Sequence, residues 1–113
     1  MQDQTAERIA ENEATFRRYN EEIRATAQKL DFPDAIPFIC ECGDVRCREI
    51  VRLARGEYEA VRADPTHFFV VPGHASAAEP NAKTVGGGNG YLIVEKVGRA
   101  GAVASEQNPR ATQ

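Results

Sequence analysis

The chain of 113 residues, of which 42% are hydrophobic, suits one domain and is too short for two independently packed cores. Its net charge of −3 gives no electrostatic reason to expect general binding to nucleic acid or to acidic membranes. Residues 1–11 are polar and charged, unlike a secretion signal, and no window approaches the ~18 apolar residues of a membrane span. We therefore expect a cytoplasmic protein that partners neither membranes nor nucleic acid.

An amphipathic helix is predicted over residues 5–30, because apolar side chains recur there at seven-residue spacing. The apolar stripe consists of Ile9, Phe16, Ile23 and Leu30, with Tyr19 and Ala27 at intermediate positions. The charged residues assigned to the solvent-facing surface are Glu11, Glu13, Arg17, Arg18, Glu21, Glu22 and Arg24. Pro33 disfavours helical geometry in the residue before it, so the helix should end ahead of it.

The narrow stripe leaves two roles for this helix. Docking on its own domain is favoured, since most amphipathic helices serve their own core. At ~1.5 Å per residue, however, such a helix spans about 40 Å, more than a small domain covers along one edge. Part of the stripe, around Ile9 and Phe16, is therefore expected to remain for a protein partner, with Tyr19 and Ile23 as further contacts.

A hairpin is predicted next. Residues 36–42 alternate as a strand, which places Cys40 and Cys42 on the same face as Ile36 and Phe38. Gly43-Asp44 favours a turn, and residues 48–53 read as the returning strand. The residues expected on the side of Cys47 are Val51 and Leu53.

The rest of the chain supplies one short helix and two further strands. The helix, at residues 56–63, is expected to bury Tyr58 and Val61, and a third strand at 68–71 leads through a glycine turn to His74. Residues 75–82 favour a loop, and the glycine run at 86–90 lacks a phosphate-loop lysine, so a flexible turn before a strand at 91–97 is expected.

This order of elements predicts an α+β fold: a long N-terminal helix, a small antiparallel sheet with a metal-bearing hairpin, and one short helix. The expected divisions are an amphipathic helix and linker at residues 1–34, a zinc-binding core at 35–97 and a flexible tail at 98–113.

The three cysteines lie within eight residues and none occurs elsewhere. Such a cluster suits metal or thiol chemistry better than structural disulfides. Cys40 and Cys42 share a strand face, and the turn at Gly43 folds Cys47 back toward them. Three thiolates and one imidazole are a common closed zinc site, and a small core gains stability from a bound metal. We therefore expect one structural Zn2+ ion.

The fourth ligand must come from a distant position. His74 is preferred among the two histidines because a strand and a glycine turn deliver it, whereas His67 lies near the predicted helix stop at Asp64-Pro65. Asp44 and Glu41 are further candidates. Strand alternation directs Glu41 to the face opposite the cysteines, which argues against it as a catalytic base.

Enzymatic function is not expected, because the zinc-deaminase, H-E-x-x-H and nucleophile-elbow patterns are all absent from the sequence. The arginines at positions 46, 48, 52, 55 and 62 alternate with acidic residues, which favours a solvated mixed-charge face over a phosphate-binding one. The leading interpretation is a zinc-stabilised protein-binding or regulatory module. A thiol redox sensor that releases zinc on oxidation is the alternative, and a small zinc enzyme or a nucleic-acid-binding module is less favoured.

The sequence also resembles a group of small uncharacterised actinobacterial proteins. The resemblance rests on Phe38-Ile39-Cys40-Glu41-Cys42, Cys47, the segment 56–62, the segment Phe68 to His74 with its Pro-Gly-His motif, and the segment 90–96. It implies a charged N-terminal helix, a C-x-C-x4-C hairpin and a downstream Pro-Gly-His, and it pairs the three cysteines with His74. It implies no catalytic residues.

Overall fold

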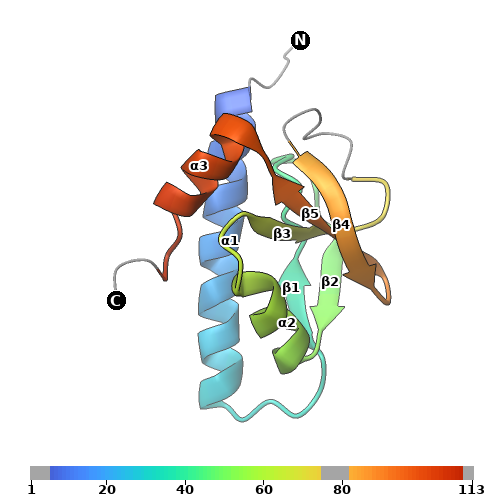
Figure 1. Ribbon diagram of the computed structural model, residues 1–113. Coiled ribbons are helices and arrows are strands. Elements are labelled where there is room, and N and C mark those ends of the chain that lie inside the picture. Colours follow the sequence, from blue (N-terminus) through green and yellow to red (C-terminus); the bar gives the residue numbers. More distant parts are fainter. Residues whose placement is uncertain (1–5, 75–81, 111–113) are drawn as a thin grey trace.

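The structure, a computed structural model, describes residues 6–74 and 82–110 and has an α+β fold. The elements in chain order are α1 (Ala6–Lys29), β1 (Ile36–Ile39), β2 (Ile50–Leu53), α2 (Arg55–Arg62), β3 (His67–Val70), β4 (Ala82–Gly88), β5 (Tyr91–Lys96) and α3 (Gly98–Glu106). The long helix α1 runs along one side of the molecule, and the strands lie on its other side (Figure 1). Among the described residues, no helix is long and apolar enough to cross a membrane.

The strands form two antiparallel sheets, whereas the sequence suggested one. The β1–β2 hairpin pairs Ile36 with Leu53, and the second sheet has the order β3-β5-β4 with β5 in the centre. The two sheets are joined just after β1, where the backbone N–H of Glu41 donates to the carbonyl oxygen of Phe69 at 3.0 Å. This junction places the end of the hairpin beside β3.

Three aromatic rings form the centre of the core between the hairpin, α2 and β3. Phe38 and Tyr58 stack with ring centroids 4.3 Å apart, and Phe69 meets both rings edge-on at 5.9 Å. All three side chains are buried, together with Val61 of α2. The predicted burial of Tyr58 and Val61 is therefore confirmed, and the aromatic geometry adds to the apolar burial.

Helix α1 packs through a face that overlaps the predicted stripe only in part. Glu13, Arg17 and Asn20 are buried, although Glu13 and Arg17 were expected to face solvent. Tyr19 and Leu30, which were assigned to the stripe, are 52% and 69% exposed. The predicted stripe is therefore right at Ile23 and Ala27, which pack against the core, and wrong at Tyr19 and Leu30, and the helix buries polar residues that the prediction placed in solvent.

Specific partners make this polar face compatible with burial. The Glu13 carboxylate lies 2.6 Å from the Lys96 ammonium in an ion pair. The Arg17 guanidinium donates to the carbonyl oxygens of Pro65 and Ala104, both at 2.8 Å, and lies over the Phe68 ring. Buried polar groups cost little when they find such partners, and periodicity does not reveal where those partners are.

The C-terminal part also corrects the sequence interpretation. The segment expected to be a flexible tail contains α3, which buries Ala104 and lies beside the N-terminal half of α1 (Figure 1). Beyond α3, the Arg110 guanidinium pairs with the carboxylates of Glu21 and Glu59, at 2.8 Å each. The residues after α3 are thus held by ion pairs, which the pattern of apolar residues in the sequence does not reveal.

The glycine run is largely strand rather than a flexible turn. Gly86, Gly87 and Gly88 belong to β4, and only Asn89-Gly90 forms the connection to β5. A Cβ atom at Gly88 would lie 2.6 Å from the Tyr91 ring, so glycine allows the close pairing. The loop predicted at residues 75–82 falls outside the described residues except for Ala82, which begins β4.

Candidate metal centre

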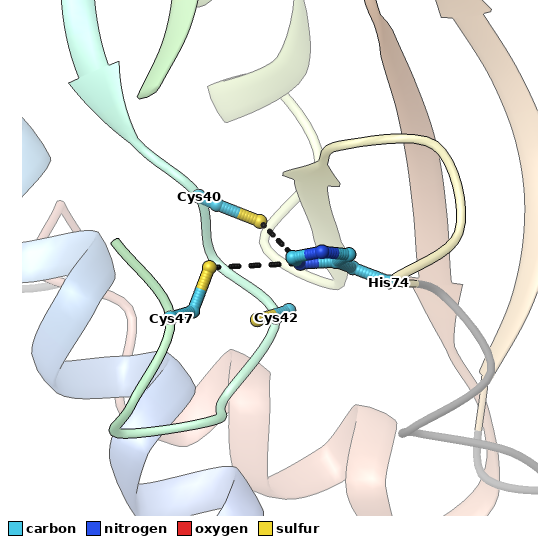
Figure 2. Close-up of side chains that lie close together, drawn as sticks. All are labelled: Cys40, Cys42, Cys47 and His74. Atoms are coloured by element: carbon cyan, nitrogen blue, oxygen red, sulfur yellow. Dashed lines mark hydrogen bonds between the residues drawn. The ribbon is translucent and has the colours of Figure 1, made fainter. Parts of the chain in front are cut away.

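Four ligating side chains from two parts of the chain converge beside the junction of the sheets. Cys40 and Cys42 follow β1, Cys47 lies in the connection to β2, and His74 follows β3. Their Sγ atoms and an imidazole nitrogen all lie within 4.8 Å of one another. Figure 2 shows the four side chains facing a common point. The structure thus brings together all four residues that the sequence selected.

The spacing suits a tetrahedral metal ion. Nδ1 of His74 lies 3.6 Å from Sγ of Cys40 and 3.5 Å from Sγ of Cys47 (Figure 2). In a tetrahedral site with metal–sulfur and metal–nitrogen distances of ~2.3 and ~2.0 Å, a sulfur and a nitrogen lie about 3.5 Å apart. The cluster can therefore hold a metal ion without large rearrangement.

Turns after the strands position the ligands. Gly43 has φ +85°, in the left-handed region, and directly follows Cys42. The Cys47 N–H then donates to the carbonyl oxygen of Asp44 at 3.0 Å, which closes the loop. On the other side, Gly73 has φ +96° and the His74 N–H donates to the carbonyl oxygen of Val71 at 3.0 Å.

Helix α1 supports the cysteine loop from behind. Asn12 Nδ2 donates to the carbonyl oxygen of Gly43 at 2.9 Å. A Cβ atom at Gly43 would lie 2.8 Å from Cγ2 of Ile9 and 3.0 Å from Cγ of Glu13, so the loop and the helix are in close contact. Ile9, expected at a partner surface, is instead half-buried against Gly43 of the cysteine loop.

Backbone N–H groups surround the sulfur atoms. The Val71 N–H donates to Sγ of Cys40 at 3.3 Å, and the backbone amides of Asp44 and Glu49 act to lower the pKa of Cys42 and of Cys47. Such hydrogen bonds favour the thiolate form, which is the form that binds metal.

The thiols also interact with one another. The nearness of the Cys40 and Cys42 sulfurs raises the pKa of Cys40 and lowers that of Cys42, and burial raises the pKa of Cys40 further. Burial likewise raises the pKa of Cys47. Without metal, the three thiols therefore lose their protons at different pH values, and metal binding must displace the protons that remain.

Glu41 does not contribute to the cluster but stabilises it from the opposite face. Its carboxylate forms a bidentate pair with Arg62, at 2.8 and 2.7 Å, and accepts from Asn20 Nδ2 at 2.8 Å. The prediction that Arg62 lies on a solvated face is wrong, because it is buried in this pair. Strand alternation correctly directed Glu41 away from the cysteines, yet nothing local in the sequence identified Arg62 or Asn20 as its partners.

The other proposed fourth ligands lie elsewhere. The Asp44 side chain accepts from the Arg46 N–H at 2.9 Å and is not among the four clustered donors. His67, at the start of β3, belongs to a different cluster with Asp64 and Glu95. The preference for His74 over these candidates agrees with the geometry.

The fold and the cluster together define an α+β protein with a candidate Cys3His metal centre. Comparison of the chain with protein-family models, curated proteins and solved structures finds no match. The resemblance to small actinobacterial proteins stays a prediction, and function must be argued from the site itself.

Proposed function

We propose that Cys40, Cys42, Cys47 and His74 bind one structural Zn2+ ion, and that the domain is a non-catalytic, cytoplasmic protein-binding module. The observation that carries the proposal is the convergence of three sulfurs and one imidazole nitrogen within 4.8 Å. Thiolate and imidazole ligands in tetrahedral arrangement favour zinc over magnesium or calcium, which bind oxygen.

Two features support a structural rather than a catalytic role. Four protein donors close a tetrahedral coordination sphere and leave no position for a substrate or a reactive water. The donors also come from both sides of the sheet junction, so a bound ion would tie the hairpin to the end of β3. In a small domain such a link contributes directly to folding free energy.

A groove beside the C-terminal half of α1 supports the protein-binding part of the proposal. Its volume is about 470 Å³, and it is lined by Tyr19, Glu22, Ile23, Thr26, Ala27, Leu30, Phe32, Ile36 and Pro37. The lining is largely apolar, and Glu22 is its one charged member. We propose that a segment of another protein inserts apolar side chains here and presents a basic residue to Glu22.

The metal part is tested by elemental analysis of protein purified in reducing buffer without added metal. We expect about one equivalent of zinc per chain, its loss in the Cys42→Ser variant, and unfolding of that variant, since zinc contributes on the order of 10 kcal/mol in small zinc modules. Arg52→Met, on the exposed side of β2, is the matched control and should keep its zinc. If the wild-type protein contains no metal, or if its melting temperature stays the same after a chelator removes the metal, the proposal is contradicted.

A redox role for the same site is the second candidate, because its thiols differ in access. Cys40 and Cys42 are buried, whereas Cys47 is only half-buried. Hydrogen peroxide would oxidise a pair of the thiolates to one disulfide and, with two protons from solvent, be reduced to water; loss of two ligands would release the zinc. Zinc release at low peroxide, reversed by a thiol reductant, would support this role; release only together with unfolding would exclude it.

A further inference from the structure

A second cluster of ligating side chains lies apart from the cysteines. Asp64 follows α2, His67 begins β3, and Glu95 lies opposite His67 on β5. One ligand atom from each of these side chains lies within 4.8 Å of the other two, and all three residues are half-buried. None of them takes part in the Cys3His cluster.

The distances within this cluster fit a shared ion better than a set of hydrogen bonds. Nε2 of His67 lies 3.4 Å from Oδ2 of Asp64 and 3.4 Å from Oε2 of Glu95. An N–H···O hydrogen bond is normally about 2.7–3.2 Å long, and one ring N–H cannot serve two acceptors equally well. Two ligand atoms ~2.1 Å from one metal ion are separated by 3.4 Å when they subtend about 110°, the tetrahedral value.

Each carboxylate is held so that one oxygen faces His67. Oδ1 of Asp64 accepts from the Thr66 backbone N–H at 2.9 Å and from its hydroxyl at 2.7 Å, which leaves Oδ2 for the ring. Oε1 of Glu95 faces the Lys83 ammonium at 3.7 Å, which leaves Oε2 for the ring. Outer partners of this kind orient the ligands of metal sites.

We infer that Asp64, His67 and Glu95 form a second divalent-cation site, for a transition-metal ion such as Zn2+, Co2+ or Ni2+. The imidazole disfavours Mg2+ and Ca2+, and the two carboxylates supply charge that suits a hard or borderline cation. Three protein ligands leave at least one position to water, so this site is open where the cysteine site is closed. Lys83 opposes binding, because its ammonium lies beside Glu95.

The test is a titration of the full-length protein, purified with its cysteine site filled, with Co2+ alone as the probe. We expect calorimetry to show one further equivalent, and absorption to show cobalt bands without the charge-transfer absorption of thiolate ligation. His67→Gln and Glu95→Gln should each weaken this binding by about tenfold or more. Glu106→Gln, on the exposed end of α3, is the matched control and should leave it unchanged.

Lys83→Met separates a metal site from a cluster of ion pairs. Removing the ammonium should tighten Co2+ binding severalfold, whereas an ion-pair cluster with no metal role would show no bound cobalt in any variant. No further equivalent in the wild-type protein, or equal binding by His67→Gln, would overturn the inference. Failure of the zinc proposal is recognised separately, because cobalt entering an empty cysteine site produces thiolate charge transfer.

Discussion

Glu41 and Arg62 form a buried bidentate ion pair on the side of the cysteine loop that faces away from the sulfur atoms, with N···O distances of 2.8 and 2.7 Å. Glu41 stands between the ligands Cys40 and Cys42, and its remaining contacts reach the Phe69 N–H and Asn20. The pair therefore connects α1, α2 and β3 to the backbone that carries two sulfurs.

Arg62→Met should destabilise the domain by about 3–5 kcal/mol, because it leaves the Glu41 carboxylate buried without its charge partner. Zinc affinity should fall as well, since Glu41 no longer fixes the strand between the two ligands. Denaturant unfolding and metal content measure both effects. Arg52→Met removes an exposed arginine and should stay within about 0.5 kcal/mol of wild type. Equal losses in the two variants would contradict the role of the pair.

The two histidines should respond differently to substitution. His74→Ala removes the one imidazole of the Cys3His cluster and should lower zinc affinity there, whereas His67→Ala should retain that zinc because His67 lies in the other cluster. Competition with a chromophoric chelator measures the affinity of each variant. A larger loss in His67→Ala would reverse the assignment of the fourth ligand.

Gly43→Ala should destabilise the domain more than Gly73→Ala. Both glycines have positive φ, so both variants carry backbone strain of about 1–2 kcal/mol. Only at Gly43 would the new Cβ meet Ile9 and Glu13, at 2.8 and 3.0 Å, and such overpacking adds about 1–3 kcal/mol. Thermal unfolding of the two variants gives the comparison, and equal melting temperatures would show that α1 moves away freely.

Leu30→Glu should abolish partner binding through the groove and leave zinc content intact, because Leu30 is exposed at the rim and contributes little to folding. Val85→Glu, also exposed but on β4, is the matched control. Pull-downs compared between the variants, with light scattering to detect self-association, measure the effect. Retention of a bound protein by both variants would argue against the groove, and a dimer lost only in Leu30→Glu would identify a second copy as the occupant.

The α+β class and the grouping of the three cysteines could be predicted because both depend on local rules, and His74 was selected because a tetrahedral site needs a fourth ligand. The predicted alternation over residues 36–42 placed Cys40 and Cys42 together, although the observed strand β1 ends at Ile39, and a glycine turn was expected to deliver His74. The packing of α1 could not be predicted, since heptad spacing selects apolar residues, while Glu13 and Arg17 are buried by partners far along the chain. The burial of Arg62 could not be predicted for the same reason, because its partner is the Glu41 carboxylate, 21 residues away in the chain.

Because the four residues of the candidate metal centre come from two separate segments of the chain, the order in which they bind and release a metal can be inferred. The three thiols lie within eight residues, whereas His74 follows Cys47 by 27 residues and comes from the other side of the sheet junction. In the proposed zinc centre, the three thiolates would gather around the ion before β3 docks, so metal capture would precede closure of the junction. In the folded protein, exchange of the ion would begin at the half-buried side of the centre, where Cys47 and His74 lie, rather than at the buried Cys40 and Cys42. Its rate should then follow the opening of one loop rather than global unfolding.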